Sequence, residues 1–141
     1  MPCDMLDCMR AFILTAALTL AGCSGLTGIC GPIDGTAATA AWGVQSSCGP
    51  GSIQVFVGDI PEDDGGDELG RAYTKSGAFR ADPDSWIIIS PQAIALEQED
   101  IVLAHEVGHL LGHDHSNDPC DIMYPNNAQI ECMRERLGIT R

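Results

Sequence analysis

The strongest constraint on this chain is the run HEVGHLLGHDH at residues 105–115, which holds all four of its histidines. His105 and His109 are four residues apart, so on a helix they project from one face about one turn apart. Gly112 then permits the backbone to leave the helix and turn back, which brings His115 toward the pair. The spacing therefore predicts a helix ending near Gly112 and a cluster of three imidazoles.

This cluster predicts a zinc site. Imidazole nitrogen is a common zinc ligand, and a catalytic site typically uses three protein ligands and leaves a fourth place for water. Glu106 stands beside His105, where it can hydrogen-bond that water instead of binding the metal. A purely structural zinc and a surface helix with coincidental histidines are the other interpretations. A structural site needs a fourth protein ligand, and His113 lies too close to His115 in the turn to serve easily, so we interpret it as solvent-facing or supporting.

The run resembles the HExxHxxGxxH signature of the metzincin zinc endopeptidases. Residues 116–125, SNDPCDIMYP, are similar to the matrixin (matrix-metalloprotease-like) branch, in which a serine follows the third histidine and a Met-turn reading M-Y-P comes soon after. This resemblance implies that Met123 lies under the zinc. It also implies that Tyr124 and Pro125, with Asn126, form part of the wall of the pocket for the substrate side chain after the scissile bond.

The implied activity is hydrolysis of peptide bonds in proteins, with protein or peptide substrates and one catalytic zinc ion. Zinc on His105, His109 and His115 would activate a water, and Glu106 would act as the general base. A catalytically inactive zinc-binding surface lipoprotein, a binding or adhesion module, remains the alternative. Peptidases whose third ligand is a distant glutamate are disfavoured, because His115 already fills that place.

The order of predicted elements indicates an α+β fold. The resemblance implies a small metzincin-like zinc-protease domain, with a short, mixed, twisted sheet, an active-site helix and a C-terminal helix. The β-prone run SWIIIS at 85–90 resembles the family's edge strand, which pairs with an extended substrate. The first strand of the family's sheet has no clear counterpart in this sequence. The predicted helices are 37–44, 97–111 and 127–137, and the predicted strands are 53–57, 69–74 and 85–90.

The N-terminal sequence predicts an export signal. Residues 11–21, AFILTAALTLA, form a short apolar run that ends in small residues, as in a secretory signal peptide. Leu20-Ala21-Gly22-Cys23 resembles the lipobox of bacterial lipoproteins, which implies a lipid on Cys23. We expect a signal peptide at 1–22, with Met9 as an alternative start, a lipidated N-terminus and linker at 23–34, and a compact metalloprotease domain at 35–141.

Two localisations follow from this organisation. The exported protein is either anchored by its lipid to the outer membrane or cell surface, or secreted after an ordinary signal peptide. Membrane contact is expected only through the lipid, and the domain is expected to be a monomer.

The seven cysteines divide in the same way. Cys3 and Cys8 precede Met9, and Cys23 is the lipid candidate. An even set is left for disulfides in an oxidising compartment, and four cysteines allow three connectivities. We favour pairing between sequence neighbours, because each pair closes a short loop; Cys30 also faintly resembles the cysteine switch of matrixin proenzymes. The disulfide candidates are Cys30, Cys48, Cys120 and Cys132.

The net charge of −13 excludes nucleic acid as a partner, because phosphate binding needs clustered Lys and Arg. The acidic loop at 58–70 offers the oxygen ligands that Ca²⁺ prefers, although such loops are often only solvated. Arg71 stands where animal matrixins carry a structural-zinc histidine, so a second zinc is not expected. The acidic residues of the loop are Asp59, Glu62, Asp63, Asp64, Asp67 and Glu68.

Overall fold

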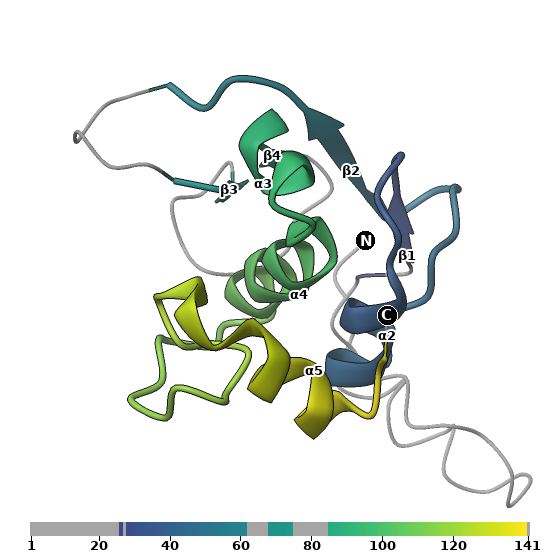
Figure 1. The fold of residues 1–141 in the computed structure, drawn as a ribbon. Coiled ribbons are helices and arrows are strands. Elements are labelled where there is room, and N and C mark those ends of the chain that lie inside the picture. Colours follow the sequence, from purple (N-terminus) through teal and green to yellow (C-terminus); the bar gives the residue numbers. More distant parts are fainter. Residues whose placement is uncertain (1–25, 27, 62–67, 75–84, 141) are drawn as a thin grey trace, which may run out of the picture.

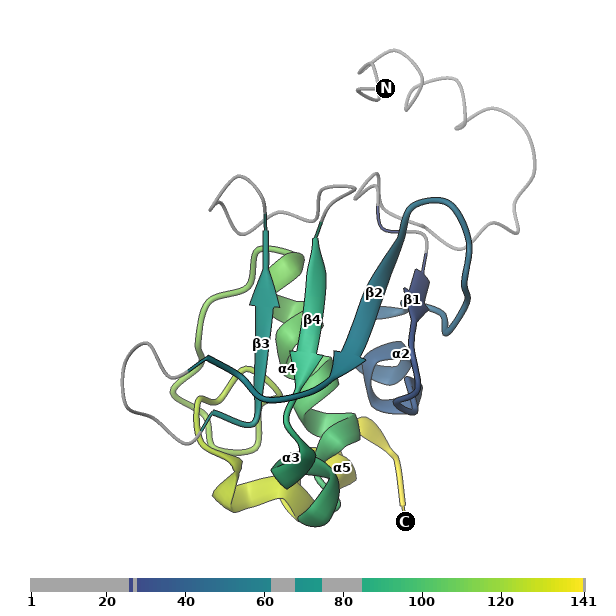
Figure 2. The same cartoon turned by 90° about the horizontal axis from the view of Figure 1, so that it is seen from above.

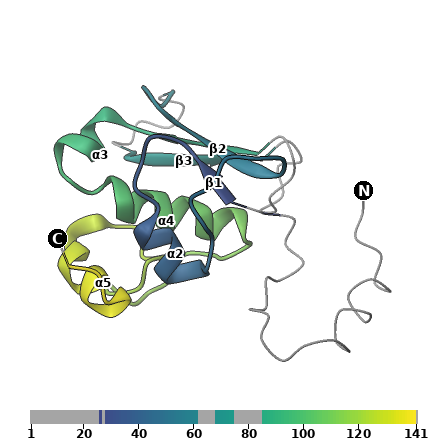
Figure 3. The same ribbon diagram turned by 90° about the vertical axis from the view of Figure 1, so that its right-hand side faces the viewer.

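The structure is a computed structural model that describes residue 26 and residues 28–61, 68–74 and 85–140. In this part of the chain one mixed sheet is covered on one face by helices, as Figures 1 and 3 show. The predicted α+β class is confirmed. The signal peptide at 1–22, Cys23 and acidic-loop residues 62–67 lie outside the described residues. Every helix of the described part is too short or too polar to cross a lipid bilayer.

The sheet has four strands in the order β1-β2-β4-β3 (Figure 2). The parallel pairs are β1 with β2 and β2 with β4, whereas β3 runs antiparallel to β4. The strands are β1 (Gly28–Cys30), β2 (Ser52–Val57), β3 (Gly70–Tyr73) and β4 (Trp86–Ile89).

The predicted position of SWIIIS at the sheet edge is wrong. Its strand, β4, lies between β2 and β3, and Ile87 and Ile89 are completely buried. Three consecutive isoleucines suit a strand that has neighbours on both sides, which is the pattern of buried parallel strands. The antiparallel edge strand is β3, which lies within the strand predicted at 69–74.

The predicted linker at 23–34 contains β1, so the folded domain begins before residue 35. Ile29 is buried, and its N–H donates to the carbonyl of Gln45 at 2.9 Å. The carbonyl of Ile29 accepts from the N–H of Ser47, also at 2.9 Å. Glycine-rich composition concealed a three-residue strand whose backbone is paired on both sides.

Helix α2 (Thr36–Trp42) connects β1 to β2. It ends two residues before the predicted Val44, because Gly43 adopts φ of 70°, a left-handed conformation that terminates helices. At the start of the helix, Asp34 Oδ1 accepts from both the N–H and the hydroxyl of Thr36. These contacts fix the direction in which α2 leaves the sheet.

The predicted helix at 97–111 is one helix, and a short helix that the sequence did not predict precedes it. Short helix α3 (Pro91–Ala95) begins after Ser90, whose hydroxyl accepts from the N–H of Ala93 at 3.2 Å. Glu97 then adopts a left-handed conformation, with φ of 55°, which separates α3 from the long helix α4 (Glu99–Leu110). The predicted start at Glu97 was therefore two residues early. The predicted helix at 127–137 is a 3₁₀ turn, η1 (Asn127–Gln129), that leads into α5 (Ile130–Leu137).

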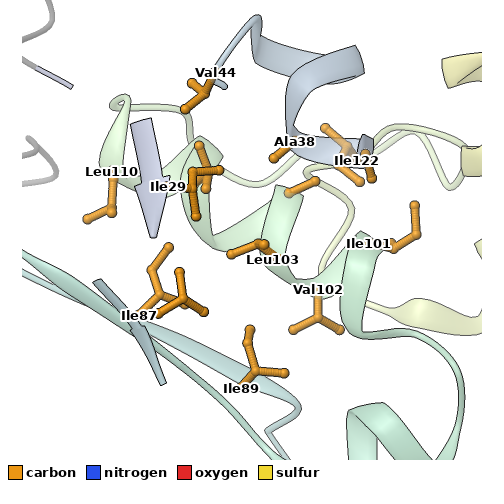
Figure 4. Close-up of a cluster of buried hydrophobic side chains, with 14 of the residues drawn as sticks. Ile29, Ala38, Val44, Ile87, Ile89, Ile101, Val102, Leu103, Leu110 and Ile122 are labelled. Atoms are coloured by element: carbon orange, nitrogen blue, oxygen red, sulfur yellow. The ribbon is translucent and has the colours of Figure 1, made fainter. Parts of the chain in front are cut away.

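The core lies between α4 and the sheet (Figure 4). On α4, Leu103, Val107 and Leu110 are at most 2% exposed, whereas Leu111, just after the helix, is half-buried. They meet Ile87 of β4 and its neighbours across the layer. This face of α4 fixes the helix to the sheet, and its opposite face carries the histidines.

A buried ion pair joins α4 to α5. Arg134 donates to Asp100 Oδ1 at 3.0 Å and to the carbonyl of Glu97 at 2.6 Å. Both charged side chains are less than 10% exposed. Because an isolated buried charge is costly, this pair specifies how α5 sits against the start of α4.

Two disulfides, Cys30–Cys48 and Cys120–Cys132, span 18 and 12 residues of sequence. They follow the pairing between sequence neighbours that we favoured. The cysteine-switch interpretation of Cys30 is wrong, because its sulfur is bonded to Cys48. The two bonds indicate an oxidising compartment and therefore an exported protein.

Candidate metal centre

Three imidazoles converge at the end of α4. The ligand nitrogens of His105, His109 and His115 all lie within 4.8 Å of one another. The Nε2 atoms of His105 and His109 are 3.1 Å apart, close to the separation of about 3.3 Å that a tetrahedral zinc site requires of its nitrogens. In the described part of the chain no other group of three His, Cys, Asp or Glu side chains could hold a metal ion. This donor set fits zinc.

Carbonyl groups orient two of the three rings. Nδ1 of His105 lies 2.8 Å from the carbonyl of Ile122, and Nδ1 of His109 lies 3.0 Å from the carbonyl of His113. With the proton on Nδ1, each ring donates to its carbonyl and turns a bare Nε2 toward the common centre. Backbone acceptors of this kind fix the tautomer and the angle of metal-binding histidines.

The turn after α4 brings His115 to the other two rings. Gly112 adopts φ of 90°, which only glycine takes readily, as its place in the sequence predicted. The N–H of His113 donates to the carbonyl of Gly108 at 3.0 Å, and the N–H of Ser116 donates to the carbonyl of Met123 at 2.9 Å. These bonds hold both ends of the residues that carry the third histidine.

Met123 lies beneath this turn and is 3% exposed. Its thioether packs so closely on Gly108 that a side chain at Gly108 would overlap the sulfur. The N–H of Met123 donates to Asp121 Oδ1 at 2.8 Å. Tyr124 is half-buried against the core and Pro125 is exposed. The chain from 121 to 125 thus returns under the histidine cluster.

Glu106 is buried, at 8% exposure, and does not belong to the histidine group. Its side chain lies against edge strand β3, where the backbone N–H of Ala72 donates to its carboxylate. A side-chain carbon at Gly70 would stand only 3.1 Å from the γ-carbon of Glu106. The edge strand therefore holds this carboxylate, which belongs to the residue after His105, outside the histidine group.

The matrixin family model matches residues 56–138, which is more than half of the chain. The chain belongs to the matrixin family. Neither a curated protein nor a solved structure matches it. Family membership supports a zinc metalloprotease that acts on protein or peptide substrates.

The electrostatics of this matrixin suit metal binding at neutral pH. Burial lowers the pKa of His105 to about 4, against a smaller opposite effect of the Ile122 carbonyl. Burial also lowers the pKa of His109. Both rings are therefore neutral at pH 7, which is the form that binds zinc.

Burial acts on Glu106 in the opposite direction. It raises the pKa of this carboxyl to about 7, and the N–H of Ala72 only partly offsets the effect. A carboxyl with a pKa near the working pH can both accept and release a proton, as general acid–base catalysis requires.

Arg71 of β3 has a partner of its own. Its Nε donates to Glu68 Oε2 at 2.7 Å, and this hydrogen bond raises the pKa of the guanidinium above its ordinary value. At the position where animal matrixins carry a zinc histidine, this matrixin therefore has a salt bridge between the edge strand and the preceding loop. Calcium binding by loop 58–70 remains a prediction.

Sequence reasoning missed three contributors to the site. Trp42 of α2 donates its indole N–H to the carbonyl of Ala104, the residue before His105, at 2.7 Å. Gly108 accommodates Met123. Ala72 acts through its backbone and so leaves no signal in the sequence, whereas a glycine inside the helical HExxH segment could have marked a close contact.

Proposed function

We propose that this matrixin is a zinc-dependent endopeptidase in which His105, His109 and His115 hold the metal and Glu106 is the general base. The observation that carries the proposal is the placement of Glu106. Glu106 follows His105 in the sequence and is buried, its carboxylate accepts from the N–H of Ala72, and it is not part of the histidine group. A carboxylate in this position adds nothing to metal affinity by ligation, but it serves proton transfer.

When bound, zinc supplies Lewis acidity, which lowers the pKa of a water molecule and polarises a carbonyl. Glu106 accepts a proton from the attacking water and delivers it to the nitrogen of the leaving amine. The pKa of about 7 allows the same carboxyl to perform both transfers near neutral pH. The hydrogen bond from Ala72 is proposed to keep the carboxylate in place during both transfers.

Edge strand β3 is the proposed binding site for the substrate backbone. It lies at one edge of the described sheet, next to β4, and it packs against α4, the helix that carries Glu106. An extended peptide can pair with such an edge as an additional strand, which presents one peptide bond to the cluster. Met123 is the proposed support beneath the metal, and Tyr124 and Pro125 are proposed to line the pocket for the next side chain.

The protein is proposed to act outside the cytoplasm. The two disulfides support export. The signal peptide at 1–22, the lipid on Cys23 and attachment to the outer membrane or cell surface are further parts of this proposal.

The deciding experiment is digestion of a proteome-derived peptide library by the purified protein and by Glu106→Gln. Loss of the base should reduce turnover by about 10²–10⁴-fold. Bound zinc should remain at one ion per chain in both proteins. Glu135→Gln is the matched control, because Glu135 is an exposed glutamate on α5.

Two outcomes contradict the proposal. Wild-type turnover by Glu106→Gln would remove the general base, and wild-type protein that holds no zinc when purified without chelator would remove the metal centre. Zinc binding without cleavage of any peptide would favour the alternative, an inactive zinc-binding surface lipoprotein.

A further inference from the structure

Trp42, at the end of α2, touches the metal-binding segment at three places. Its indole N–H donates to the carbonyl of Ala104 at 2.7 Å. Its ring stacks on the imidazole of His113, with centroids 4.4 Å apart and planes 24° apart. Its edge also lies over Gly108, where an added Cβ would stand 2.8 Å from Cζ2. One side chain thus contacts residues before, between and after the two histidines of α4.

The stacked residue, His113, fixes a metal-binding ring through its backbone. Its carbonyl accepts from Nδ1 of His109 at 3.0 Å, and its N–H donates to the carbonyl of Gly108 at 3.0 Å. Any movement of the His113 backbone would therefore rotate His109. His115 follows His113 by two residues in the same turn, so the position of His113 also affects the position of the third histidine.

The contact at Gly108 extends the connection to Met123. The absence of a side chain at Gly108 lets the indole and the thioether reach the same point on α4. Trp42 therefore packs where the helix, the following turn and the returning chain meet.

We propose that Trp42 is a positioning residue of the metal centre: its indole clamps the His113 turn onto α4 and so holds His109 and His115 in the geometry that binds zinc. The inference rests on the proposed zinc site. Tryptophan suits this role because it offers a flat face for stacking and an N–H donor at the same time. Neither phenylalanine nor leucine supplies both.

Packing between α2 and α4 is the competing explanation for Trp42. The fully buried residues of α2 are Ala37 and Ala38, whereas Trp42 is only half-buried. If Trp42 merely fills space, its replacement lowers stability and leaves the folded metal centre unchanged. The two explanations therefore differ in what happens to zinc.

The test measures the zinc Kd of the full chain by competition with a chromophoric chelator, for the wild type, Trp42→Phe and Trp42→Leu. Orienting contacts around metal ligands are worth about 10–100-fold in affinity. We expect a loss in this range for Trp42→Leu and a smaller loss for Trp42→Phe, which keeps the stacking face. Trp86→Phe is the matched control. Trp86 lies on β4, where it stacks on Tyr73 and, unlike its neighbour Ile87, is only partly buried.

A second pair of variants separates the ring of His113 from its backbone. His113→Ala removes the stacking partner and should weaken zinc binding, whereas His113→Phe should restore most of the affinity because an aromatic ring again meets the indole. Replacement of zinc by Co²⁺ gives a spectroscopic readout, since the visible bands of Co²⁺ report ligand geometry. These bands should shift in the Trp42 variants and remain unchanged in Trp86→Phe.

The outcomes distinguish this inference from the function on which it rests. Wild-type protein that binds no zinc would overturn the proposed function. A Trp42→Leu protein with a lower melting temperature but wild-type zinc affinity and wild-type cobalt bands would overturn the inference and leave the function intact. Equal zinc affinity in His113→Ala and the wild type would contradict the clamp as well.

Discussion

Helix α4 lies between two regions that are held together differently. On one side it meets the sheet through apolar side chains, and Ile87, Ile89 and Leu103 are completely buried there. On the other side it meets residues 111–126, which contain no helix or strand. This second region is ordered by turns, by one disulfide and by hydrogen bonds that the carboxylates of Asp118 and Asp121 accept from backbone N–H groups.

The difference teaches where stability and function reside in this matrixin. Burial of apolar surface is large and non-directional, so the sheet side supplies free energy of folding without fixing individual atoms closely. Hydrogen bonds are directional, and the segment 111–126 uses them to place His115 and Met123 relative to α4. Changes on the sheet side should therefore lower stability, and changes in the segment should alter the metal centre.

Leu103→Ala should give the largest effect. Leu103 is fully buried between α4 and the sheet, and truncation of such a leucine costs about 2–5 kcal/mol. Denaturant unfolding of the metal-free protein measures this cost, with Ile94→Ala as an exposed control. The folded fraction should bind zinc with wild-type affinity. A weakened zinc Kd in fully folded Leu103→Ala would contradict the separation of the two regions.

The two disulfides provide a matched test of the same comparison. Removal of either bond, as Cys30→Ser/Cys48→Ser or Cys120→Ser/Cys132→Ser, should cost about 3 kcal/mol, slightly more for the longer loop. Only the second bond involves the segment 111–126, because it joins Cys120 of that segment to Cys132 of α5. Only removal of this second bond should weaken zinc binding, by about 10-fold, as loss of an orienting contact does. Equal zinc affinities in the two double variants would show that the segment keeps its shape without its disulfide.

The predictability of the molecule follows the same division. Residues 105–115 specify their local geometry through spacing, so the helix, the glycine turn and the convergence of three rings could be predicted. The hydrogen bonds from His105 and His109 to carbonyls could not, because backbone acceptors carry no residue identity.

The sheet was harder to predict. The run SWIIIS was recognised as a strand, but its place between β2 and β3 depends on pairing between segments distant in sequence. The strand at Gly28–Cys30 escaped notice because its glycine-rich composition resembles a linker. Trp42 lies 62 residues from its hydrogen-bond partner Ala104, so no local pattern connects them.

The smallest expected effect concerns pH, and it probes the two sides of α4 separately. His105 bonds to Ile122 in the segment, and Glu106 bonds to Ala72 in the sheet. In metal-free protein the pKa of His105 is lowered from 6.5 to about 4, so its contribution to stability is present above pH 6.5 and is lost as pH falls toward 4. His109, whose pKa is also lowered, adds in the same direction.

Glu106 opposes these histidines. Its pKa is raised from 4.5 to about 7, so its contribution is present below pH 4.5 and is lost as pH rises toward 7. Between pH 5 and 7 the opposing slopes should largely cancel in the wild type. Glu106→Gln removes one of them, so its stability should fall on acidification by roughly 2 kcal/mol more than that of the wild type. Urea unfolding of both chelator-treated proteins at pH 5 and pH 7 measures this difference, and parallel changes in the two proteins would show that the Glu106 carboxyl is not buried against β3 in the metal-free state.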